Sequence, residues 1–135
     1  MPRRRSLLIV REYTVFPEIY VSSRRNFNPK KMIIYNTTFH IHQDILDECL
    51  AYLKSDYIPK AARSGILRTP RLRRVLQSAN EEGESYSVQF HADDIDSLNR
   101  WIREEGAALQ QALINRYREK IVGFSTLLEE ITLPE

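Results

Sequence analysis

The chain has 135 residues, the length of one domain, and is long enough to bury a hydrophobic core without disulfides or metal ions. Its single cysteine, Cys49, excludes an internal disulfide and a cysteine-rich zinc module, and it favours a reducing, cytoplasmic compartment. The net charge of +2 divides into +6 over residues 1–31 and −4 over residues 32–135, so the remainder of the chain has no basic excess that favours nucleic acid.

Residues 1–31 differ in composition from the rest of the chain, and we interpret them as a basic N-terminal extension. Two explanations stay open: a disordered tail that contacts RNA or a membrane surface, or a mis-assigned start with Met32 as the true first residue. The apolar run Leu7–Val10 is shorter than the core of a signal peptide, and no apolar run reaches the roughly 18 to 20 residues of a membrane helix.

The stretch Met32–His42 alternates in the manner of a strand, whose side chains point to opposite faces with a period of two. One face is apolar enough to lie under helices: Ile33, Tyr35, Thr37, Phe39 and Ile41. The other becomes polar towards its end: Met32, Ile34, Asn36, Thr38, His40 and His42. We therefore predict the central strand of a sheet that is covered on one side.

The next two segments are a helix and a strand. Gln43–Lys60 has an apolar stripe of helical period, with Pro59 expected to disturb its last turn. Ile66–Gln77 reads as the second strand. Pro70 lacks a backbone donor, so this strand is expected at an edge of the sheet or with a bulge.

The pattern then repeats in the order strand, helix, strand. Glu84–His91 alternates as a third strand, and Asp93 or Asp94 is expected to cap a second helix. Gly106 is predicted to break that helix. Lys120–Ile131 is predicted as the last strand.

The order βαββαβ predicts an α+β fold of the ferredoxin-like type over residues 32–131, with a tail at 132–135. In this arrangement four antiparallel strands form one sheet, and both helices cover the same face. The first and third strands are central. The second and fourth lie at the edges, in agreement with Pro70.

The uncovered face is where we expect function. Six polar side chains of the two central strands share it: Asn36, Thr38, His40, Ser87, Gln89 and His91. A second copy packed face to face would form a dimeric α/β barrel with a cavity between the sheets. We expect a homodimer whose cavity binds a small apolar or aromatic molecule.

Few residues of this face are candidates for catalysis or metal binding. His40 and His91 are the residues to test as acid or base, because histidine titrates near neutral pH. His40 and His42 have a spacing that suits a metal, but no Asp or Cys pattern completes a set, so we predict no metal site and no cofactor. The sequence contains no phosphate loop and no nucleophile elbow.

Other residues read as structural. Cys49 and Trp101 fall in helical apolar stripes and are expected in the core. Three arginines of the second strand could bind an anion or simply protect an exposed sheet edge. They are Arg71, Arg73 and Arg74.

Several motifs together resemble a bacterial family known as domain of unknown function 4286, over about residues 32–131. They are Met-Ile-Ile-Tyr-Asn-Thr-Thr-Phe at 32–39, Tyr57-Ile58-Pro59, Ser64-Gly65-Ile66, Tyr86-Ser87-Val88-Gln89-Phe90 and Gly123-Phe124-Ser125-Thr126-Leu127-Leu128. The resemblance implies a small cytoplasmic protein close to the dimeric α/β-barrel superfamily, with no established activity. The chain departs from the pattern where Tyr57 replaces a histidine and where Gly106-Ala107-Ala108 replaces His-Ala-Pro, so any chemistry of those histidines is absent.

Two other functions remain as hypotheses. One is a cofactor-independent monooxygenase or isomerase, which rests on fold analogy. The other is an RNA-binding module, which requires aromatic side chains of the central strands on the open face. Those aromatics are predicted to point towards the helices: Tyr35, Phe39, Tyr86 and Phe90.

Overall fold

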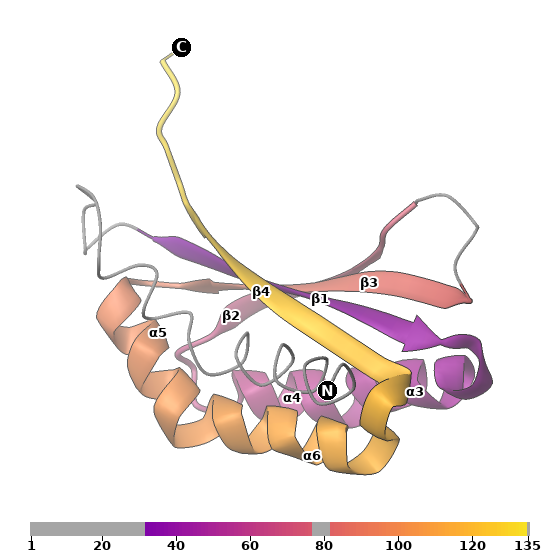
Figure 1. Cartoon of the computed structure of the whole chain (residues 1–135). Coiled ribbons are helices and arrows are strands. Elements are labelled where there is room, and N and C mark those ends of the chain that lie inside the picture. The colour runs from indigo at the N-terminus through magenta and orange to yellow at the C-terminus, as the bar shows by residue number, and fades with distance from the viewer. Residues whose placement is uncertain (1–31, 77–81, 135) are drawn as a thin grey trace, which may run out of the picture.

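The computed structural model of the chain describes residues 32–76 and 82–134. The basic extension predicted at residues 1–31 lies outside the described residues. The described part forms one sheet with helices against one of its faces (Figure 1).

The sheet has four antiparallel strands in the order β2-β3-β1-β4. The strands are β1 (Ile33–His42), β2 (Arg68–Arg74), β3 (Gly83–Ala92) and β4 (Ile121–Glu129). This confirms the ferredoxin-like fold, with the first and third strands in the centre. Strand β2 is clearly shorter than the predicted Ile66–Gln77, and β4 is slightly shorter than the predicted Lys120–Ile131.

Strand β1 shows the burial that its alternation predicts. Ile33, Tyr35, Thr37, Phe39 and Ile41 are buried, and the residues between them are partly exposed. Figure 1 shows the helices below the sheet, while no helix of residues 32–76 or 82–134 covers the opposite face. The side of β1 that becomes polar therefore belongs to an open sheet face.

Strand β2 is an irregular edge strand, as Pro70 predicts. Its pairing with β3 shifts between Arg68 and Arg71. Thr69 has a φ of 56° at this point, a conformation uncommon for a residue with a side chain. The missing donor of Pro70 thus falls in a bulge at the edge of the sheet.

The first helical region is continuous but changes pitch. Its segments are η1 (Gln43–Ile45), α3 (Leu46–Tyr52), the π-helical η2 (Leu53–Tyr57) and α4 (Ile58–Ala62). Pro59 is the second residue of α4, two residues after the end of the π segment. Because proline has no N–H for an i→i−4 bond, a change of pitch next to it has a clear physical cause.

The second helical region corrects one prediction, because the chain stays helical through Gly106. Its segments are α5 (Ile95–Trp101), the π-helical η3 (Ile102–Gly106), α6 (Ala107–Tyr117) and the short 3₁₀ turn η4 (Arg118–Lys120). Asp94 caps the start, accepting a hydrogen bond from the Ser97 N–H at 2.8 Å. A Cβ on Gly106 would lie 2.4 Å from the Trp101 ring, so the glycine makes room for the indole.

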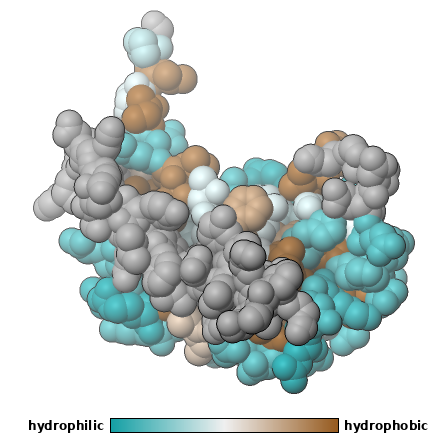
Figure 2. Space-filling view, in the orientation of Figure 1, coloured by the Kyte–Doolittle hydropathy of each residue, from teal (hydrophilic) through white to brown (hydrophobic). Residues whose placement is uncertain are grey.

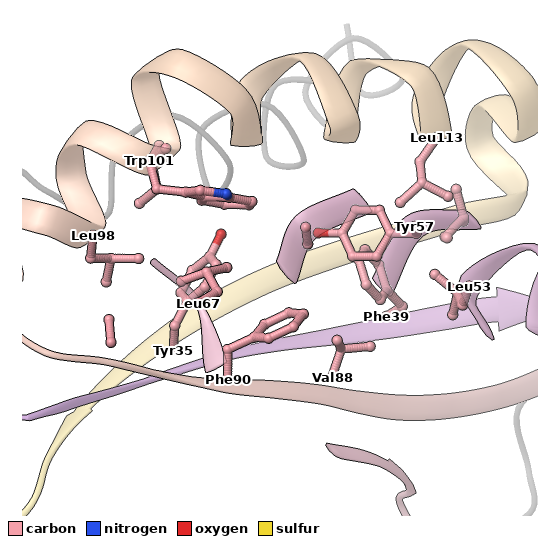
Figure 3. Close-up of a cluster of buried hydrophobic side chains, with 14 of the residues drawn as sticks. Tyr35, Phe39, Leu53, Tyr57, Leu67, Val88, Phe90, Leu98, Trp101 and Leu113 are labelled. Atoms are coloured by element: carbon pink, nitrogen blue, oxygen red, sulfur yellow. The ribbon is translucent and has the colours of Figure 1, made fainter. Parts of the chain in front are cut away.

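The core lies between the helices and the sheet and is rich in aromatic residues (Figure 3). Tyr35 meets Trp101 edge to face, with ring centroids 6.0 Å apart. Phe39 and Tyr57 form a second such pair at 5.9 Å. Both pairs join the central strand to a helical region, so they fix the helices over the sheet.

Replacing Gly106 by alanine tests the contact with Trp101. In an open helix this change stabilises by up to about 1 kcal/mol, but here the added methyl enters the indole ring. We expect Gly106→Ala to lower the free energy of unfolding in urea by about 1–3 kcal/mol. Ala108→Gly at an exposed position of α6 measures helix propensity alone. A gain in stability for Gly106→Ala would show that the ring does not need this space.

Candidate functional site

The candidate site is the open face of the sheet, whose middle is polar. The pairing of strands places Asn36 opposite Gln89 and Thr38 opposite Ser87. All six predicted residues lie on this face and are partly buried. The structure therefore brings Asn36, Thr38, Ser87 and Gln89 together in the centre.

These central side chains are paired with one another. Ser87 Oγ donates to Asn36 Oδ1 at 2.5 Å, and Asn36 Nδ2 donates to Thr38 Oγ1 at 3.2 Å. Gln89 Oε1 accepts from Arg73 Nη1 at 3.2 Å. Because these polar groups already have partners, covering them costs less than burying unpaired groups.

The two candidate histidines share the face but lie far apart along it. His40 is opposite Ser85, whereas His91 is opposite Ile34. Ser85 and His91 are six residues apart on β3, which corresponds to about 20 Å along a strand. His40 Nδ1 lies 3.0 Å from Ser85 Oγ. The two imidazoles are therefore too far apart to act together on one bond.

His42 has a structural role at the end of β1. Its Nδ1 accepts a hydrogen bond from the Asp44 N–H at 3.0 Å, and its Nε2 lies 3.3 Å from Glu82 Oε1. The described residues contain no group of three His, Cys, Asp or Glu side chains that could hold a metal ion. His40 and His42 alone supply two ligands, fewer than a zinc site uses.

The predicted arginine cluster divides between the two sides of β2. Arg71 and Arg73 are opposite Gln89 and Ser87, so they lie at the edge of the open face. Arg74 is opposite Tyr86, on the other side of the strand, and its Nη1 lies 3.8 Å from Glu84. Two of the three arginines therefore border the site.

A row of apolar side chains on β4 completes the open face, although none of them is among the predicted site residues. Val122, Phe124 and Leu128 are 38%, 45% and 43% exposed and lie opposite His40, Thr38 and Ile34. We call these three residues the β4 apolar row. Strand parity was the signal that could have found them.

The apolar surface continues beyond β4. Ile131 and Leu133 are 62% and 77% exposed. Figure 1 shows this C-terminal segment leaving the sheet on the side opposite the helices. Figure 2 shows hydrophobic surface along the tail and at its base.

One polar residue inside the protein was also not predicted as buried. Gln110 is 3% exposed and sits on the buried side of α6, three residues before Leu113. A glutamine at a core position of an apolar stripe is the sequence signal that could have revealed it.

No helix among the described residues is long and apolar enough to cross a membrane.

Cys49 is fully buried and free, as its place in the helical stripe predicts. Burial raises the pKa of its thiol to about 12, with a smaller contribution from the nearby Glu48 carboxylate. Cys49 is therefore a core residue, because the thiolate is the reactive form.

The family model described as "Domain of unknown function (DUF4286)" matches residues 32–131. Comparison with curated protein sequences finds no match.

Solved structures share the fold at low identity. A dimeric ferredoxin-like protein from an uncultured marine organism has a TM-score of 0.58 at 10% identity, covering 77% of this chain and 99% of its own. SnoaB, a cofactor-independent oxygenase from Streptomyces nogalater, has a TM-score of 0.54 at 17% identity, covering 78% and 99%. An ethyl tert-butyl ether d (ethd) family protein from Bacillus halodurans C-125 has a TM-score of 0.58 at 16% identity, covering 74% and 99%.

The burial and raised pKa of Cys49 predict that its thiol reacts slowly in the folded protein. At pH 8 the native protein should react with Ellman's reagent at least about a hundredfold more slowly than in 6 M urea, because burial withholds the thiolate. The reaction is monitored by absorbance, with free cysteine in each solvent as the control. Equal rates in the folded and unfolded chain would contradict the buried position.

Proposed function

The chain belongs to the DUF4286 family, and we propose that it works as a homodimer whose two open sheet faces pack together around a cavity for a small molecule. The observation that carries this proposal is the β4 apolar row on a face that the helices of the same chain leave uncovered. One of the solved structures with a similar fold is a dimeric ferredoxin-like protein.

Burial of the apolar row supplies the driving force. Covering apolar surface stabilises an interface by about 25 cal/mol per Å². Ile34 extends the row onto β1, opposite Leu128. The polar centre of the face is hydrogen-bonded within one chain, so a second copy can cover it without leaving those groups unpaired.

The class of ligand is set by the side chains that would line the cavity. Phe124 and Ile34 are apolar, and Asn36, Thr38 and Gln89 are polar and uncharged. This mixture suits a small apolar or aromatic molecule with a hydrogen-bonding group.

The border of the face adds one charged feature. Arg71 and Arg73, at the edge beside β2, would favour a negative charge at one end of the ligand. A cytoplasmic location belongs to the same proposal and rests on the free, buried Cys49.

RNA binding has little support on the described face. Tyr35, Phe39 and Phe90 are 2%, 5% and 2% exposed and pack towards the helices, so they cannot stack on bases. Any contact with nucleic acid through the basic residues 1–31 lies outside the described residues.

A cofactor-independent oxygenase or isomerase is the second candidate. SnoaB, which shares the fold, is a cofactor-independent oxygenase, and at 17% identity that likeness concerns the fold alone. The spacing of about 20 Å between His40 and His91 means that one histidine, not the pair, would serve as acid or base. Unchanged turnover in a His40→Ala, His91→Ala double variant would remove this assignment.

Arginine in the middle of the open face tests the dimer. Asn36→Arg and Gln89→Arg should each weaken dimerisation at least about tenfold, because a buried, unpaired guanidinium costs several kcal/mol. Light scattering after gel filtration, over a dilution series, measures the change. The control is Gln111→Arg, on the exposed side of α6. Folded variants that remain as dimeric as the control would contradict face-to-face packing.

A further inference from the structure

The layer between the sheet and the helices contains a connected set of polar side chains. The hydroxyls of Tyr35 and Tyr57 both lie beside the side chain of Gln110, and the Tyr35 hydroxyl also lies beside Thr37 and Ser125. These hydrogen-bonding neighbours lower the pKa of the two phenols, against the larger effect of burial. Thr37 Oγ1 and Ser125 Oγ are 3.0 Å apart. We call these five residues the inner polar cluster. They come from four segments, β1, η2, α6 and β4, which the fold brings together in one place.

Trp101 borders this cluster through its contact with Tyr35. Figure 3 shows its ring nitrogen and the hydroxyls of Tyr35 and Tyr57 directed into the layer between the second helical region and the sheet. Tyr35, Tyr57 and Trp101 are each 2% exposed or less. The wall around these polar atoms is therefore aromatic.

Two atoms of this region have no hydrogen-bond partner in the protein. They are Trp101 Nε1, which carries a hydrogen to donate, and Gln110 Oε1, which can accept one. An unpaired buried polar group destabilises the folded state, so two of them in one core require an explanation. A molecule that accepts from the indole and donates to the amide would satisfy both.

Both helical regions change pitch beside the cluster. The π segment η2 ends at Tyr57, and the π segment η3 begins directly after Trp101. Single π turns within helices are costly and are found often at functional sites. Here each one adjoins an aromatic residue that borders the polar atoms.

A narrow opening leads to the cluster between edge strand β4 and α6. It is lined by Thr37, Gln110 and Ser125 of the cluster, with Leu113 and Ile114 on the helical side. Its volume of about 10 Å³ is close to the space that one water molecule needs. Val122 and Phe124 of the β4 apolar row also line this opening, so it lies at the sheet edge next to the open face.

The site carries no formal charge near neutral pH. Burial raises the pKa of the Tyr35 phenol and of the Tyr57 phenol, so both hydroxyls stay protonated. The other members are an amide and two aliphatic hydroxyls, which do not ionise. An uncharged ligand is therefore the class that fits, since a bare charge would be costly here.

We propose that the inner polar cluster and Trp101 form a binding site for a hydroxyl group, whose oxygen accepts from Trp101 Nε1 and donates to Gln110 Oε1. Water supplies this group, because the space beside Gln110 has room for one water molecule. This inference does not rest on the proposed function, because its two unpartnered atoms are buried within one chain.

The single tryptophan of the chain gives a direct readout, because the ¹⁵N spectrum contains one indole N–H signal. In the full-length protein, we expect a cross-peak between this N–H and water in a rotating-frame Overhauser experiment. Gln110→Met should remove the cross-peak. Gln111→Met, the neighbouring exposed position, should retain it. If Gln110→Met fails to fold, Tyr57→Phe takes its place and should reduce the cross-peak.

The proposal is overturned if the wild-type indole shows no water cross-peak, or if Gln110→Met retains the cross-peak as strongly as Gln111→Met does.

Discussion

The alternation of β1 is the constraint on which the rest of the structure depends. Its odd-numbered residues from Ile33 to Ile41 are buried under the helices, so its even-numbered residues necessarily share the opposite face. The same parity on β3 and β4 adds Gln89 and Phe124 to that open face. One hydrophobic pattern thus places the core on one side and the candidate interface on the other.

Two aromatic contacts translate this pattern into a defined position for the helices. Trp101 and Tyr57 reach down from the two helical regions to Tyr35 and Phe39 of the same strand. The contact between Trp101 and Tyr35 requires glycine at position 106, because a side chain there would occupy the place of the indole. The inner polar cluster lies between the two contacts, so packing and the proposed hydroxyl site share the same aromatic residues.

Much of this could be predicted from the sequence, because strand parity and helical stripes are local signals. Pro70 indicated an edge strand, and the six polar residues of the open face were assigned to the correct side. The distance between His40 and His91 was not predictable, because parity gives the face of a residue and only the pairing register gives its place along the strand. The prediction of a helix break at Gly106 was wrong because the role of this glycine depends on a ring five residues away.

The central claim is that two open faces meet, and an isotope-filtered NMR experiment tests it most directly. A mixture of ¹³C-labelled and unlabelled full-length chains reveals contacts between protomers only. We predict intermolecular contacts from the Phe124 ring to methyl groups of open-face residues such as Ile34 and Thr38. A mixed sample that contains dimers but shows no such contacts, or that stays monomeric at millimolar concentration, would contradict the account.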